Sequence, residues 1–114
     1  MVGQAPEIAV ARIRRWCAGR VPEPARDQVR VESEVDGRDV TIVECRAPYS
    51  ADIGSDWARF PVARLRYLTS RGVWRLHWRD SDERWHEYPD LPFARLVDDR
   101  LAEVDRDPTA IFWG

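Results

Sequence analysis

The feature of this sequence that most constrains its fold is a change in the spacing of its apolar residues. Between residues 6 and 19 they recur every three or four positions, which predicts a helix. Pro6 suits the first position of that helix, and Gly19 is typical of its end. From Val29 to Val35 apolar residues alternate with charged ones, which is the pattern of a strand with one buried face. The chain therefore combines helix and sheet.

The rest of the chain reads as a series of short strands followed by a second helix. Further strands are expected over residues 40–46, 62–68, 73–79 and 84–88. Short turns at residues 36–39, 69–72 and 80–83 join neighbouring strands as hairpins. Residues 47–60 read as a long loop, whose role the sequence leaves open. The second helix is expected from about residue 93 to residue 106, with an apolar stripe formed by Leu96, Val97, Leu101 and Val104.

Length and composition fit one small globular domain. The chain has 114 residues, of which 44% are hydrophobic and 33% charged, so residues 1–114 are expected to share one core, with residues 1–5 as a loose tail. We predict an α+β fold with an N-terminal helix, an antiparallel meander of about five strands, a C-terminal helix and a docked aromatic tail. Both helices should cover the same sheet face. Whether Phe112 and Trp113 are buried or anchor a partner stays open at this level.

The charged residues favour a local binding surface over a general affinity for nucleic acid. The formal net charge is −2, and all 18 basic residues are Arg, so no global field attracts phosphate backbones.

No apolar stretch is long enough to span a membrane, and the N-terminus does not resemble an export signal. Cys17 and Cys45 lie far apart without a metal-binding spacing. They are expected to be reduced thiols of a cytoplasmic protein.

Strand register is expected to gather basic side chains on one face of the sheet, because directly opposed residues of antiparallel strands share a face. A turn centred on residues 70 and 71 sets Arg66 opposite Arg75. A turn centred on residues 81 and 82 sets His77 opposite His86. One face is then an apolar core formed by Leu65, Tyr67, Trp74, Leu76, Trp78 and Trp85. The other, the predicted Arg/His face, carries Arg64, Arg66, Arg75, His77, Arg79, Arg84, His86 and Tyr88.

Two interpretations of the predicted Arg/His face stay open. Opposed arginines destabilise a sheet by about 0.2–1 kcal/mol per pair. In the first interpretation, neighbouring acids such as Glu32 and Glu34 neutralise the arginines. In the second, the face binds an anion. In the second case Arg forks, His protons and the Tyr88 hydroxyl are the donors. A metal held by His77 and His86 is not expected, because the arginines repel cations and no third ligand accompanies the pair. No cofactor is expected either, since phosphate-binding glycine motifs are absent from the sequence.

Four segments resemble a bacterial family known as domain of unknown function 3024, which is common in actinobacteria. They are residues 27–32, 61–67, 85–88 and 105–114, and the closing Phe112-Trp113-Gly114 carries the most weight. The resemblance implies a small standalone domain. It implies no activity, ligand or catalytic residue, because none is established for that family.

We therefore expect a non-catalytic binding or accessory domain whose Arg/His face takes an anionic ligand or an acidic protein surface. An alternative is a small enzyme that acts on an anionic metabolite, with His77 or His86 as general acid–base and the arginines orienting the substrate. A third is a structural protein that oligomerises through an apolar patch, for which a homodimer would be the first sign. The sequence does not decide among the three.

Overall fold

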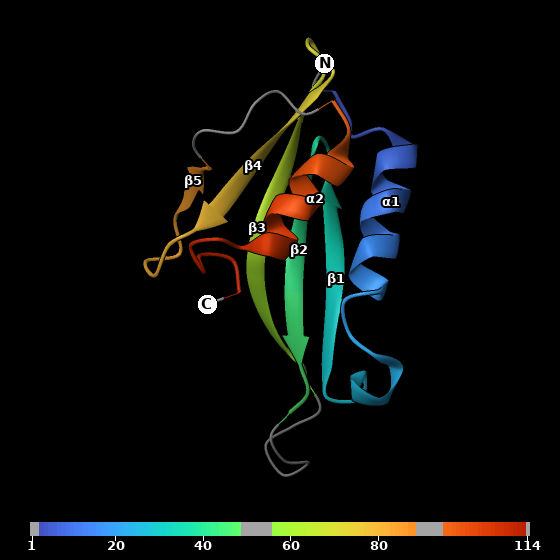
Figure 1. Cartoon of the computed structure of the whole chain (residues 1–114), viewed down its shortest axis with the longest axis vertical. Coiled ribbons are helices and arrows are strands. Elements are labelled where there is room, and N and C mark those ends of the chain that lie inside the picture. The colour runs from blue at the N-terminus through green and yellow to red at the C-terminus, as the bar shows by residue number, and fades with distance from the viewer. Residues whose placement is uncertain (1–2, 49–55, 89–94, 114) are drawn as a thin grey trace.

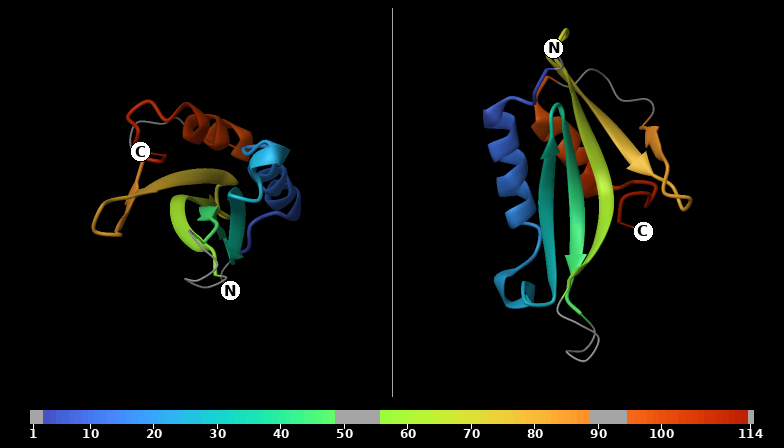
Figure 2. Two further views of the ribbon diagram at one scale, coloured as in Figure 1. Left: turned by 90° about the horizontal axis from the view of Figure 1, so that it is seen from below. Right: turned by 180° about the vertical axis from the view of Figure 1, so that it is seen from behind.

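A computed structural model describes residues 3–48, 56–88 and 95–113 of the chain. In chain order the elements are α1 (Glu7–Ala18), a 3₁₀ helix η1 (Glu23–Ala25), β1 (Val29–Asp36), β2 (Asp39–Arg46), β3 (Ala58–Leu68), β4 (Val73–Arg79), β5 (Trp85–Glu87) and α2 (Val97–Arg106). The five strands form one antiparallel meander in the order β1-β2-β3-β4-β5. Both helices lie on one side of this sheet (Figures 1 and 2). The predicted α+β fold is confirmed.

The core lies between the two helices and the sheet face that they cover. Ile13 of α1, Leu65 of β3 and Val104 of α2 are fully buried there. Each such side chain stabilises the fold by roughly 1.5–3 kcal/mol relative to its exposed state. Since the helices cover one face only, we call the other side of the sheet the open face.

Helix α2 brings two charged residues into this core. Arg100 is 7% exposed, and its Nε donates a hydrogen bond of 2.9 Å to the carbonyl oxygen of Trp74. The backbone N–H of Tyr88 donates to the Leu76 carbonyl, so the carbonyl of Trp74, two residues earlier, points to the same edge of β4. Arg100 thus supplies a donor to a carbonyl on this edge of β4. Glu103, also buried, accepts a hydrogen bond of 3.2 Å from the Tyr88 hydroxyl.

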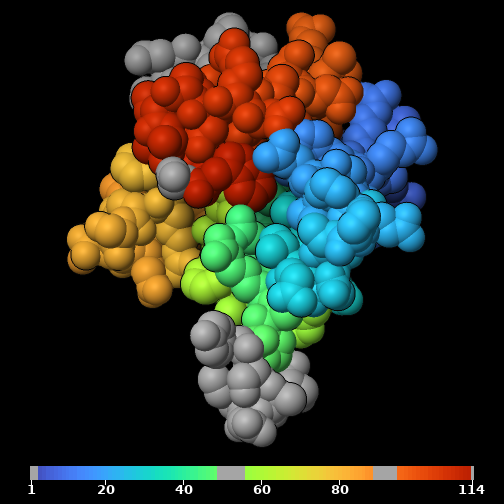
Figure 3. Space-filling model, turned by 60° about the horizontal axis from the view of Figure 1, so that its bottom comes forward, coloured from blue at the N-terminus to red at the C-terminus, as the bar shows by residue number. Residues whose placement is uncertain are grey.

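The C-terminal segment is docked onto the domain. Asp107 ends α2 in the left-handed conformation, with φ at 41°, and its carboxylate accepts the backbone N–H groups of Phe112 at 3.1 Å and Trp113 at 3.0 Å. The buried Phe112 ring packs against Tyr88, and the indole N–H of Trp113 donates to the Val104 carbonyl. In Figure 3 the segment, drawn in red, fills the space beside the β4–β5 hairpin. The docked aromatic tail is confirmed.

A stacked arginine joins the end of α1 to this tail. The guanidinium of Arg20 contacts the rings of both Trp16 and Trp113, with its Cζ atom 5.3 and 4.9 Å from their centroids. It also pairs with Asp105 of α2. Cation–π contacts of this kind contribute about 0.5–1 kcal/mol each at exposed sites and more where they are desolvated.

The start of β3 differs from the prediction. The strand begins at Ala58, four residues before the predicted start at residue 62, so the long loop predicted for residues 47–60 is shorter. The register between β2 and β3 shifts between Ile42 and Val43, next to Pro61. A bulge accommodates a proline because the backbone is not fully paired there. Residues 49–55 of the predicted loop lie outside the described residues.

The start of α2 also differs. The helix begins at Val97, whereas the sequence predicted a start near residue 93. Leu96, assigned to the apolar stripe, precedes the helix in an extended conformation and is 54% exposed. Residues 89–94 lie outside the described residues. The other three residues of the predicted stripe are buried as expected.

Candidate functional site

The pairing of β3 with β4 places basic residues on the open face as predicted. Arg66 lies opposite Arg75, and Arg64 lies opposite His77. Arg79 follows His77 by two positions on the same strand, so it shares their face. These five of the eight predicted site residues therefore stay together.

The pairing of β4 with β5 is shifted by one residue from the prediction. Arg79 lies opposite Trp85 and His77 opposite Glu87, where Arg84 and His86 were predicted. A one-residue shift exchanges the two faces of a strand. Trp85, which the sequence assigned to the core, and Glu87 are therefore on the open face.

The connection between these strands explains the shift. The Asp80 carboxylate accepts the backbone N–H groups of Asp82 at 2.8 Å and Arg84 at 2.9 Å. Glu83 adopts a left-handed conformation with φ at 66°. The loop therefore contains one residue more than the four predicted, and Arg84 lies in the loop, outside the strand. An aspartate that bonds to following backbone groups is a common turn former.

Two predicted site residues consequently lie on the helix-covered face. His86 stacks on Trp78, with ring centroids 4.7 Å apart, and its Nε2 is 2.5 Å from a carboxylate oxygen of Asp80. This hydrogen bond, followed by those from the backbone, lowers the pKa of Asp80. Tyr88 contacts the Phe112 ring of the tail. The predicted pairing of the two histidines is thus wrong, since His77 and His86 are on opposite faces.

Two arginines of the open face have acidic partners that the sequence analysis did not identify. Arg66 forms two hydrogen bonds, of 2.8 and 3.1 Å, with the Asp39 carboxylate of β2. Arg75 pairs with Glu87 of β5. Burial alone would raise the pKa of Asp39, but the hydrogen bonds and charge of Arg66 outweigh it, so the pKa is lowered. The opposed pair of Arg66 and Arg75 is therefore neutralised within the domain.

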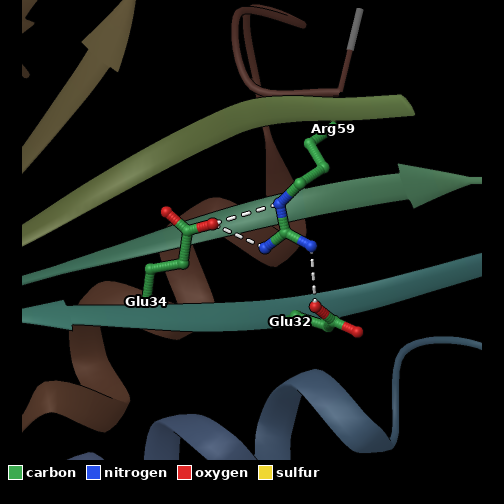
Figure 4. Close-up of polar contacts among 3 residues, drawn as sticks. All are labelled: Glu32, Glu34 and Arg59. Atoms are coloured by element: carbon green, nitrogen blue, oxygen red, sulfur yellow. Dashed lines mark hydrogen bonds and ion pairs between the residues drawn. The ribbon is translucent and has the colours of Figure 1, made fainter. Parts of the chain in front are cut away.

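The acids proposed for that role, Glu32 and Glu34, instead bind Arg59. Figure 4 shows the Arg59 side chain reaching across β2 to both carboxylates on β1, at 3.0 Å from Glu32 and at 2.5 and 3.2 Å from Glu34. Cys45 lies opposite Arg59 on β2 and is 1% exposed, although neither α1 nor α2 covers its face. Burial, followed by the charge of Glu32, raises the pKa of Cys45. Cys45 is thus a buried, protonated and unreactive thiol beside this arginine.

The remaining two arginines flank Trp85. The Cζ of Arg64 is 4.4 Å from the centre of the Trp85 ring, and that of Arg79 is 5.9 Å from it. Arg64 donates a hydrogen bond of 3.2 Å to the Thr41 hydroxyl. Arg79 is 3.5 Å from Glu83, whose side chain is 78% exposed. Within the described residues, Arg64 has no carboxylate partner and Arg79 has only this distant one.

In this part of the open face, two buried nitrogen atoms lack hydrogen-bond partners among the described residues. They are Nε of Arg79 and Nδ1 of His77. Burial, followed by the charge of Arg66, lowers the pKa of His77, so its ring is neutral at neutral pH. A buried polar group without a partner costs about 1–3 kcal/mol. We call Arg64, His77, Arg79 and Trp85 the Trp85 cluster.

The family comparison agrees with the sequence resemblance. Residues 3–114 match the family described as domain of unknown function (DUF3024). The chain belongs to this family. Comparison of this chain with curated proteins and with solved structures found no match.

Two further findings concern the described part of this DUF3024 domain. None of its helices in residues 3–48, 56–88 and 95–113 is both long and apolar enough to cross a membrane. In the same ranges no group of three or more His, Cys, Asp or Glu residues is placed to hold a metal ion.

Three cavities of this DUF3024 domain lie away from the Trp85 cluster. The first, of about 180 Å³, is between the end of α1 and β1. The second, of about 500 Å³, is between the start of α1 and the β1–β2 turn. The third, of about 320 Å³, lies between Phe60 and the docked tail. No residue of the cluster lines any of these three cavities.

Proposed function

We propose that this domain is a non-catalytic binding module that recognises a carboxylate-rich surface of another protein through the Trp85 cluster. One observation carries the proposal. Arg64 and Arg79 flank an aromatic ring on the open face without a close carboxylate among the described residues. Guanidinium groups form strong, geometrically specific hydrogen bonds with carboxylates, which makes this part of the open face well suited to an acidic partner.

The composition of the cluster favours a protein partner over a small metabolite. Trp and Arg are the residues that most often dominate the binding energy of protein interfaces. Small ligands, in contrast, bind in concave pockets that bury most of their surface. The three cavities described above are lined by other residues.

The enzymatic alternative has less support. It required a histidine as general acid–base within a pocket that holds an anionic substrate. His86 is engaged by Asp80 and Trp78 on the opposite face from the arginines, which leaves His77 as the one histidine beside them. No cavity described above contains His77.

The test is a binding titration with a fluorescently labelled hexaglutamate peptide, followed by anisotropy at several salt concentrations. The double variant Arg64→Gln/Arg79→Gln should bind about tenfold more weakly, which corresponds to about 1.4 kcal/mol. The matched control is Arg12→Gln/Arg46→Gln, which removes two exposed arginines that have acidic partners elsewhere. Circular dichroism checks that both variants are folded.

The outcomes separate the possible ligands. Equal weakening by both double variants would mean that the peptide responds to net charge, which contradicts a specific cluster. Displacement of the peptide by low millimolar inorganic phosphate, with loss of that effect in Arg64→Gln/Arg79→Gln, would replace the acidic protein by a small anion as the ligand.

A further inference from the structure

Strand β1 is the outermost strand of the sheet on the side next to α1. In Figures 1 and 2 the helix runs alongside β1, displaced toward the covered face. Among the described residues, this edge of the sheet thus pairs with no further strand, and α1 borders part of its length.

The backbone groups on this edge can be identified from the register. The N–H of Ala47 donates to the carbonyl of Gln28, and hydrogen-bonded pairs recur every second residue along an antiparallel ladder. Even-numbered residues of β1 therefore bond to β2, whereas the N–H and C=O groups of Val31, Ser33 and Val35 point away from the sheet. In the described part of the chain, no hydrogen bond reaches the outward groups of these three residues.

Two cavities with a partly apolar lining lie between this edge and α1. The first, of about 180 Å³, is lined by Cys17, Ala18, Val21 and Val31, together with Arg26, Arg30 and Glu32. The second, of about 500 Å³, is lined by Val10, Ala11 and Val35, together with Gln4, Ala5, Glu7, Arg14 and Gly37. An apolar cavity of about 150 Å³ is large enough for a benzene molecule, so each accepts at least one apolar side chain.

The spacing of the cavities matches the repeat of an extended chain. Val31 lines the first and Val35 the second. Four residues of a strand span about 13 Å, and side chains four positions apart point to the same face. A strand placed beside β1 would therefore direct two of its side chains, four residues apart, into the two cavities.

The first cavity has a basic rim. The guanidinium of Arg26 bonds to the carbonyls of Ala18 and Val21 at the end of α1, and that of Arg30 lies 4.4 Å from the centre of the Trp57 ring. Neither arginine pairs with a carboxylate in the described residues. Glu32, also on this rim, is already bound to Arg59. This end of the groove therefore favours an acidic group.

We propose that the groove between α1 and β1 binds an extended peptide segment of a partner protein, which adds a strand to the edge of the sheet. The segment places two apolar side chains, four residues apart, in the two cavities, and a carboxylate beside Arg26 and Arg30. Main-chain hydrogen bonds supply affinity in this mode of recognition, and the pockets supply specificity. The site is independent of the Trp85 cluster, which lies on β3, β4 and β5.

The probe is a phage-displayed library of random octapeptides, selected against the full chain, followed by synthesis of the strongest binder. Selected peptides should contain two apolar residues four positions apart and an acidic residue toward one end. Ser33→Pro should weaken binding of the synthetic peptide at least tenfold, because it removes the central outward N–H of β1. The variant should still fold, since that N–H does not bond to β2. Ser33→Ala, which retains the N–H, should bind like the wild type.

Two further variants test the other features of the groove. Ala11→Trp introduces a bulky side chain into the second cavity and should weaken binding, independently of any effect of proline on the strand. Arg26→Gln/Arg30→Gln should weaken binding of the selected peptide. It should not weaken binding of an analogue in which the acidic residue is replaced by Asn.

Several results would overturn the proposal. A selection that yields no binder, peptides without the four-residue spacing, or equal binding by Ser33→Pro and Ser33→Ala would each do so. A wild-type dimer that Ser33→Pro dissociates, with no peptide binding, would assign the edge to a second copy of the chain. Unchanged peptide binding in Arg64→Gln/Arg79→Gln is expected, and a loss there would contradict two independent sites.

Discussion

Replacement of Trp85 by alanine separates the observed arrangement of the β4–β5 hairpin from the one that the sequence predicted. In the structure, Trp85 is a partly exposed side chain held by cation–π contacts with Arg64 and Arg79. Two such contacts at about 0.5–1 kcal/mol each, with the loss of a little apolar burial, give an expected cost of about 1–2 kcal/mol. A tryptophan in the core would cost about 3–5 kcal/mol.

Urea unfolding of Trp85→Ala alongside Trp74→Ala makes this comparison within one protein. Trp74 is 2% exposed in the core and serves as the reference for a buried tryptophan. We expect Trp85→Ala to lose less than half of the unfolding free energy that Trp74→Ala loses. Equal losses would refute the observed register, because they would place Trp85 in the core.

Three other predictions concern side chains outside this hairpin. Asp107→Ala should lower the free energy of unfolding in urea by about 2 kcal/mol, because it removes two hydrogen bonds to the tail and places alanine in a left-handed conformation. An unchanged urea midpoint would contradict the docking of the tail. Arg66 holds the pKa of Asp39 below its value in the unfolded chain, so their pairing stabilises the fold above about pH 4. This stabilisation is lost as the pH falls through the lower folded-state pKa. When the urea midpoint is measured at decreasing pH, Asp39→Asn should therefore lose less stability than the wild type. Arg59→Ala should speed the alkylation of Cys45 by iodoacetamide, measured by mass spectrometry, whereas equal rates in variant and wild type would show that the arginine does not cover the thiol.

The parts of the fold that could be predicted were those with local sequence signals. The β1–β2 turn has Gly37 at a φ of 61° in its first central position, as a two-residue hairpin of type II′ requires. The β3–β4 turn likewise ends with Gly72 at a φ of 64°. At these turns the glycine marks where the chain reverses. The position of the β1–β2 turn and the register of the β3–β4 hairpin were predicted correctly.

The β4–β5 connection has no such marker. Its left-handed position is occupied by Glu83, and the loop is organised by the side chain of Asp80. Sequence alone offered no reason to count five loop residues instead of four. The error placed Trp85 on the wrong face and set His77 opposite His86, although His86 lies on the other face in the structure.

The candidate site was predictable in part for the same reason. Arg64, Arg66 and Arg75 lie on strands whose register was right, and they share the open face. Asp39 could have been found as the partner of Arg66, because the β1–β2 turn and the meander order together bring it beside β3. Glu87 could not, because its position depends on the β5 register.

The most direct test of the Trp85 cluster is an NMR titration of the ¹⁵N-labelled protein with hexaglutamate. It follows the indole N–H signals and the arginine Nε–H signals. We predict that the signals of Trp85, Arg64 and Arg79 shift together with one binding constant, while the indole signal of Trp74 in the core does not move. Shifts confined to arginines outside the cluster, or none at all, would contradict the proposed recognition of acidic groups on the open face.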